Sequence, residues 1–266
     1  MKAIAGIDNI HLIIGYSLLI IPFIIFWYFK IKLGKATLVA VARMSIQLFL
    51  VALYLEYIFK LNNPYINILW VLVMIAVGVR TTIKRVNLKA RYFVIPLVLA
   101  LFSSLVFIDA FFLGIILKLP YVFEARYFIP ISGMILGNAM NYNIIGLNSY
   151  FEGLVKDEDF YYFLLVNAGN RKKALVPFIR RSIKKALSPM IGTMTVMGLI
   201  ALPGMMTGQI LGGSSPATAI KYQILIAVAI FSGGTLNLTL SIIFSNKFVF
   251  DSYDRLDRNR ILKAAK

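Results

Sequence analysis

Two pairs of polar side chains inside apolar stretches are the first candidates for chemistry in this sequence. Arg43 and Gln47 lie four residues apart in one stretch, and Asn138 and Asn141 lie three apart in another. Side chains at these spacings share a helix face, and a charge or an amide in hydrocarbon requires a partner. The amides could line a polar path or join two helices. Arg43 could bind an anionic substrate or extend to the lipid headgroups.

Sulfur and glycine define a second candidate region near residue 200. Met205 and Met206 supply thioethers, which fill a core or contact a soft cation. They follow Pro203, which lacks a backbone donor and must bend or end a helix. Glycines that recur every four residues form smooth ridges that allow close helix packing. We expect a seam between helices that moves and that bends at Pro203. The glycines of this seam would be Gly133, Gly137, Gly204, Gly208 and Gly212.

Composition excludes several kinds of catalytic and metal site. The 266 residues include no cysteine and one histidine, so thiolate metal sites, iron–sulfur clusters and histidine clusters are excluded. No Gly-x-x-x-x-Gly-Lys-Ser/Thr loop is present, since Gly34-Lys35 is followed by Ala36. We therefore expect neither ATPase activity nor a bound cofactor on this chain. A metal substrate would have to meet oxygen and thioether groups, and its ligands stay unknown.

The elements that must position these residues are membrane helices. The sequence is 60% hydrophobic with a mean hydropathy of +0.82, whereas soluble domains are roughly 45–50% apolar. Seven apolar stretches are long enough to cross a bilayer, so we predict an all-α, polytopic helical bundle. The expected spans are 10–29, 36–59, 66–82, 92–117, 128–149, 188–212 and 219–245.

The basic residues predict the orientation of these spans. Lysine and arginine outnumber aspartate and glutamate 28 to 11, and most of them lie between the spans, which favours lipid headgroups over nucleic acid as their partners. With the N-terminus outside and the C-terminus inside, 22 of the 28 lie on the cytoplasmic side, so we predict N-out/C-in. Glu56, near an outer end, and Asp109, deeper in the fourth span, have no assigned role.

The cytoplasmic segment 150–187 is the longest connection, and such connections usually have a task. Ala168-Gly169 is typical of a helix end, and residues 171–176 would form a short helix before Pro177. A basic amphipathic helix follows, and its apolar face is Ile179, Ile183 and Leu187. This pattern fits a helix on the inner membrane surface or a docking platform for a cytoplasmic protein, and sequence physics leaves both open.

Three longer blocks carry a family resemblance. They are residues 43–48 (Arg-Met-Ser-Ile-Gln-Leu), 129–140 (Ile-Pro-Ile-Ser-Gly-Met-Ile-Leu-Gly-Asn-Ala-Met), and 198–208 (Gly-Leu-Ile-Ala-Leu-Pro-Gly-Met-Met-Thr-Gly) with 219–223 (Ala-Ile-Lys-Tyr-Gln). With these blocks in this order along most of the chain, the protein resembles the FetB-type membrane subunits of ATP-binding-cassette (ABC) transporters. Residues 179–189 resemble the family's cytoplasmic segment, although the glycine-rich turn before it is altered.

The resemblance implies a plasma-membrane permease, formed by two copies of the chain and driven by a separate cytoplasmic ATPase that holds ATP and Mg²⁺. Residues 1–266 would be one transmembrane permease domain, in contact with lipid and not with nucleic acid. Residues 150–187 would contain the ATPase-coupling element. Its candidate residues are Ala168, Gly169, Arg171, Lys172, Ala174 and Pro177.

The substrate implied by the resemblance is a metal, since bacterial members are regarded as iron exporters. A plant relative, an aluminium-tolerance half-transporter, is associated with UDP-glucose transport, so export of a nucleotide sugar is the alternative. A nucleotide sugar would need Arg43 as a cation for its phosphates, whereas a metal would need Asn138, Asn141, Met205 and Met206. Interpretations of another class are a secondary transporter, for which we find no internal repeat, and a membrane scaffold for a cytoplasmic enzyme.

Overall fold

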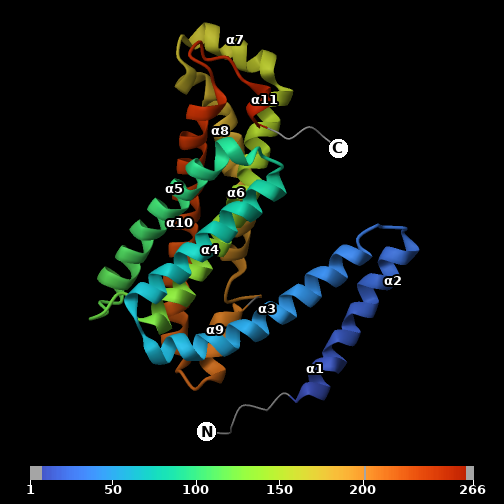
Figure 1. The fold of residues 1–266 in the computed structure, drawn as a ribbon, viewed down its shortest axis with the longest axis vertical. Coiled ribbons are helices and arrows are strands. Elements are labelled where there is room, and N and C mark those ends of the chain that lie inside the picture. Colours follow the sequence, from blue (N-terminus) through green and yellow to red (C-terminus); the bar gives the residue numbers. More distant parts are fainter. Residues whose placement is uncertain (1–7, 201, 262–266) are drawn as a thin grey trace. The chain divides into compact units, whose positions relative to one another are not determined.

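The computed structural model describes residues 8–200 and 202–261, and Figure 1 shows that they form helices joined by short connections. An isolated β-bridge joins Phe250 and Leu256. The described chain divides into two compact units, one within residues 1–61 together with 211–214, the other within 62–210 and 215–266. The predicted all-α class is confirmed.

The first unit consists of two membrane-length helical segments. α1 (Asn9–Tyr16), the 3₁₀ turn η1 (Ser17–Leu19) and α2 (Ile20–Tyr28) follow one another, and α3 (Gly34–Leu61) is a single long helix. Pro22 has no N–H to donate to the Leu18 carbonyl, which explains the tight turn at this point. The Tyr16 hydroxyl forms a hydrogen bond with the Ser45 hydroxyl and thereby joins the two segments.

The second unit is a bundle built around two long helices, α6 (Ala125–Lys156) and α10 (Pro216–Val249). α10 packs against α5 (Ala90–Asp109) and α6, and α6 also packs against α4 (Pro64–Val86) and α8 (Arg171–Val196). The remaining helices of the described chain are the π-helical η2 (Ala110–Ile116), α7 (Glu158–Ala168), α9 (Gly204–Leu211) and α11 (Arg258–Ile261).

Glycines let α6 and α10 approach each other closely. A Cβ at Gly234 of α10 would lie 1.9 Å from Cδ2 of Tyr142 in α6. A Cβ at Gly146 of α6 would lie 2.5 Å from Cδ1 of Leu238 in α10. Both distances are far below van der Waals contact, so the two helices can adopt this separation only because glycine occupies these positions.

Five helical segments are long and apolar enough to cross a membrane: 10–28, 34–61, 64–86, 90–116 and 216–249. They confirm a multi-pass membrane bundle and coincide with five of the seven expected spans. The expected span 128–149 lies within the single helix α6, whose polar residues keep it out of this set. The number of spans and their orientation therefore stay predictions.

The expected span 188–212 is wrong as a continuous helix. α8 ends at Val196, Gly198 has a φ of +86°, and α9 begins at Gly204, directly after Pro203. Pro203 therefore lies at the start of α9 and not within a helix, so the expected bend of one span at Pro203 is replaced by a break between two helices. Gly198 suits this break because glycine readily adopts a positive φ. Gly212 lies beyond the end of α9 and does not continue the expected glycine ridge.

Candidate functional site

A corner between α7 and α8 lies within the segment expected to couple to an ATPase. α7 ends at Ala168, and Gly169 adopts a φ of +57° while its N–H bonds the Leu165 carbonyl. The Asn170 side chain then accepts a 2.8 Å hydrogen bond from the Lys172 N–H and caps α8. The expected helix end at Ala168-Gly169 is therefore confirmed, and glycine suits it because it tolerates the left-handed conformation.

The helix after this corner is longer than expected. α8 runs from Arg171 to Val196 and does not stop at Pro177. The helix packs against α6, where the Ser182 hydroxyl donates a 2.7 Å bond to the Gly146 carbonyl. This packing outweighs the backbone hydrogen bond that Pro177 cannot make. α8 is therefore part of the bundle.

The expected coupling residues differ in their accessibility. On or near the surface are Ala168, Gly169, Lys172 and Pro177. Ala174, in contrast, is only 1% exposed. Its expected role as a direct contact of an ATPase is therefore wrong for this fold, because its side chain is used inside the protein. The helical spacing did not reveal which face of α8 is covered.

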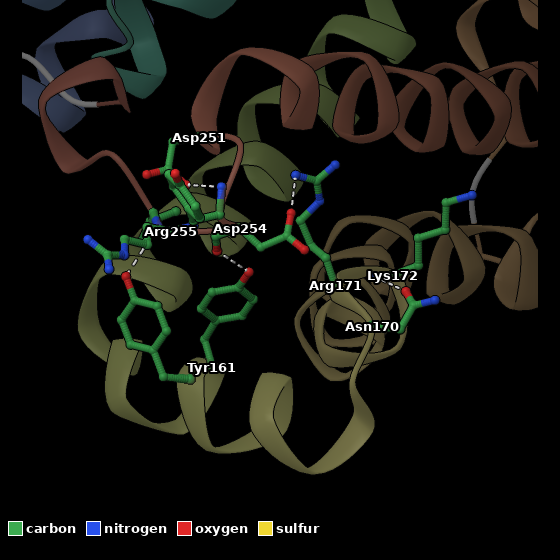
Figure 2. A network of polar contacts seen from close by, with 10 residues as sticks. Tyr161, Asn170, Arg171, Lys172, Asp251, Asp254 and Arg255 are labelled. Atoms are coloured by element: carbon green, nitrogen blue, oxygen red, sulfur yellow. Dashed lines mark hydrogen bonds and ion pairs between the residues drawn. The ribbon is translucent and has the colours of Figure 1, made fainter.

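Residues 250–261, which follow α10, fasten the corner, as Figure 2 shows. The Arg171 guanidinium lies 2.6 Å from the Asp254 carboxylate and 5.3 Å from the centroid of the Phe250 ring. The Tyr161 hydroxyl donates a 2.8 Å bond to the Asp254 carbonyl. Burial, together with the neighbouring Asp254 carboxylate, raises the pKa of Tyr161 above its ordinary value. The hydroxyl therefore stays a donor at neutral pH.

A second set of contacts extends along the same segment. Arg258 pairs with Glu158, whose carboxylate also accepts a 3.0 Å hydrogen bond from the Tyr162 hydroxyl. The N–H of Lys89, between α4 and α5, donates a 3.1 Å bond to the Ile261 carbonyl. One C-terminal segment thus holds two connections of the bundle. We call α7, residues 169–173 and residues 250–261 the cap.

The cap exposes an apolar ridge on α7. Phe160, Phe163 and Val166 recur every three residues and are 48%, 62% and 83% exposed. Lys172 and Lys173 are exposed beyond the corner. Exposed apolar side chains beside charged ones are typical of a surface that contacts another protein. The ridge, defined as Phe160, Phe163 and Val166, is the cap's best candidate contact surface.

The six expected pathway residues lie on three helices. Arg43 and Gln47 lie one turn apart on α3 and line a shallow groove of the first unit. The Asn138 Nδ2 atom donates a 2.9 Å bond to the Met134 carbonyl of its own helix. The remaining three are Asn141, which is exposed, Met205, which is half-buried, and Met206, which is buried. A pathway shared by all six stays a prediction.

The expected glycine seam is not formed within the described chain. A Cβ at Gly133 would lie 3.1 Å from Cε of Met74 in α4. A Cβ would meet no atom within 4 Å at Gly137, Gly204 or Gly208. The close approach of helices occurs instead at Gly146 and Gly234.

A buried polar band joins α6 and α10, and the sequence reasoning missed its α10 side. Asn143 Nδ2 donates a 3.1 Å bond to Ser241 Oγ, and Asn237 Nδ2 donates a 3.4 Å bond to the Ala139 carbonyl. Asn237, Ser241 and Ser245 recur every four residues, so the signal was present in the sequence. Such hydrogen bonds hold membrane helices together.

Comparisons with known proteins agree with this architecture. The family described as "Uncharacterised protein family (UPF0014)" matches residues 9–250. "UPF0014 membrane protein YjkA" of Bacillus subtilis (strain 168) is 29% identical, over 87% of this chain and 91% of its own length. "Probable iron export permease protein FetB" of Escherichia coli (strain K12) is 28% identical, over 94% and 95%. "UPF0014 membrane protein STAR2" of Oryza sativa subsp. japonica is 31% identical, over 80% and 73%. No solved structure gives a significant match.

Proposed function

The chain belongs to the UPF0014 family of membrane proteins, as its resemblance to the FetB-type subunits predicted, and we propose that it is the membrane subunit of an ABC transporter. A separate cytoplasmic ATPase would hydrolyse the ATP, because this sequence has no phosphate-binding loop of its own. The membrane-length segments would form the body of the permease, and a second copy would complete the pathway.

The observation that carries this proposal is the cap. Its ridge presents apolar side chains to a partner, while the buried Tyr161 and the Arg171–Asp254 pair fix the orientation of α7. α7 follows α6 after Asp157, and α8 packs along α6. A partner that moves the ridge would therefore move α6 and α8 as well. This is the linkage that ATP-driven transport requires.

For the substrate we propose a metal ion that is exported. The support is the word iron in the name of the Escherichia coli relative, which this chain matches over nearly its whole length. Asn138 and Asn141 would supply amide oxygens, and Met205 and Met206 would supply thioethers. Hard ions would favour the oxygens, and softer ions would also use sulfur.

Reconstitution in vesicles tests the proposal. An ABC ATPase is first sought by co-purification with the full chain. The two proteins are then reconstituted, and movement of ⁵⁵Fe is followed with and without ATP. Iron movement should require both ATP and the ATPase. Phe163→Asp should reduce co-purification of the ATPase and transport together, because it places a charge in the apolar ridge. Tyr253→Asp, an exposed aromatic of the cap outside the ridge, is the matched control and should leave both unchanged.

Each contrary result has a distinct meaning. Iron movement without the ATPase would contradict the proposal and indicate a secondary transporter. Unchanged ATPase binding by Phe163→Asp would place the contact elsewhere. ATP-driven movement of UDP-glucose in place of iron would support the nucleotide-sugar alternative, for which Arg43 in the groove of α3 offers a cation.

A further inference from the structure

A buried carboxylate lies in a part of the second unit away from the cap and the polar band. Asp109, the last residue of α5, is 4% exposed. The Ser132 hydroxyl of α6 donates a 2.6 Å bond to its Oδ2 atom. The other oxygen, Oδ1, has no hydrogen-bond partner among the described protein atoms. Oδ1 is therefore a buried acceptor without a partner among the described protein atoms.

The backbone changes its helical form directly after Asp109. The helix η2 is π-helical, and the N–H of Leu117 bonds the Phe112 carbonyl, five residues earlier, at 2.9 Å. π-Helical turns are rare and occur frequently at functional sites. The regular membrane helix thus ends where the carboxylate lies, which points to a role for this position beyond packing.

Asp109 lines a cavity with a volume of about 300 Å³, a size at the lower end of small-molecule sites. The rest of the lining is almost entirely apolar and includes Val71 and Ile75 of α4. Leu72 and Phe102, which also line the cavity, are exposed. The cavity can therefore be reached from the surface of the unit. Its shape offers an apolar chamber with a single acceptor for a charged or polar group.

A carboxylate in such surroundings requires a cationic partner when it is ionised. The ion pairs of the described residues do not include Asp109. A divalent metal ion would need more oxygen ligands than Asp109 and Ser132 supply. An ammonium group can instead pair with a carboxylate through a single charge-assisted hydrogen bond, and apolar walls suit a hydrocarbon body.

We propose that this cavity binds an amphipathic organic cation, a primary amine with a short hydrocarbon tail. The ammonium group donates to Oδ1 of Asp109, while Ser132 holds the carboxylate in place through Oδ2. The tail fills the space between α4 and α5. The site is separate from the cap, and its occupation does not depend on which substrate the protein transports.

Binding of octylammonium to the full chain in lipid nanodiscs tests this site, with empty nanodiscs as the blank. Asp109→Asn keeps the shape of the side chain and removes its charge. It should lower the affinity at least about tenfold, as expected for a lost charge-assisted hydrogen bond. Octanol, which has the same tail and no charge, should bind both proteins alike. Glu56→Gln removes an exposed carboxylate from α3 and should leave the octylammonium affinity unchanged.

Leu72→Trp provides a second variant, because it fills the cavity and keeps Asp109. It should abolish octylammonium binding. Equal affinity in the wild-type protein and folded Asp109→Asn would overturn the proposal, as would full binding by Leu72→Trp. Tighter binding of octanol than of octylammonium would also overturn it, since that order indicates a neutral carboxyl group. If Asp109→Asn does not fold, the octanol comparison and Leu72→Trp decide.

Discussion

Replacement of Gly234 by alanine tests how α6 and α10 pack. The added Cβ would lie 1.9 Å from Cδ2 and 2.0 Å from Cε2 of Tyr142. Carbon atoms in relaxed contact are about 3.5–4.0 Å apart, so the ring or the helix must move by about 1.5 Å. Tyr142 is itself 5% exposed, which leaves its ring little room to move. The strain must therefore spread into both helices.

The expected change in stability follows from two opposing terms. Overpacking a core costs about 1–3 kcal/mol, while alanine is more favourable than glycine in a helix by about 0.5–1 kcal/mol. Gly234→Ala should therefore destabilise the protein by about 1–2 kcal/mol. Gly137→Ala is the matched control, because its Cβ would meet no atom within 4 Å. Gly137→Ala gains only the higher helix propensity of alanine and should therefore be slightly stabilising.

Reversible unfolding by dodecyl sulfate in mixed micelles, followed by circular dichroism, measures both variants. The double variant Gly234→Ala with Tyr142→Leu should recover part of the lost stability, because the smaller side chain leaves room for the new methyl group. The reasoning is refuted if Gly234→Ala is as stable as the wild-type protein, or if Gly137→Ala is the more damaging change.

Three further predictions concern the cap and the pathway. Asp254→Asn removes the ion pair with Arg171. Because the Asp254 and Arg171 side chains are 38% and 33% exposed, the loss of stability should be at most about 1 kcal/mol. Amide hydrogen exchange in α7 should become faster, and unchanged exchange would show that the pair contributes nothing. The pKa of Tyr161 in the folded protein lies above its ordinary value of 10.0. Protection of α7 against amide hydrogen exchange should therefore be complete below pH 10 and be lost as the pH rises toward the folded-state pKa. Tyr161→Phe should remove this pH dependence, and a pH dependence that persists in the variant would belong to another group. In vesicles, Arg43→Gln should abolish transport of an anionic nucleotide sugar and only modestly affect transport of a metal cation. The double variant Asn138→Leu with Met205→Leu should abolish metal transport and only modestly affect the nucleotide sugar. If neither variant changes any transport, these residues do not line the pathway.

Hydropathy was sufficient to predict most of the long helices. α4, α10 and the continuous pair α5 and η2 begin and end within a few residues of their apolar stretches, because burial in lipid and helix formation select the same side chains. It failed for 188–212, since residues 197–200 and 202–203 are mostly apolar and yet not helical. Hydropathy does not register the positive φ of Gly198 or the missing donor of Pro203.

The partners of individual residues were much harder to predict. Glycine spacing shows that a helix has a smooth face, but it does not show which helix lies against that face. The closest approach accordingly occurs at Gly146 and Gly234, outside the expected set. Arg171 and Asp254 are 83 residues apart in the sequence. In a chain with such a surplus of basic residues, no local pattern indicates which of them a given carboxylate binds.

Because a protein is synthesised from its N-terminus, the contacts that hold the cap together form late. Residues 158–171 leave the ribosome long before residues 250–261. Until that last segment arrives, Tyr161 lacks both its acceptor at Asp254 and the Phe250 ring, whose centroid lies 5.4 Å from its own in the finished protein. A nascent chain thus carries an open corner until residues 250–254 have been made. A protein that recognises the closed corner would therefore bind only chains that extend beyond these residues.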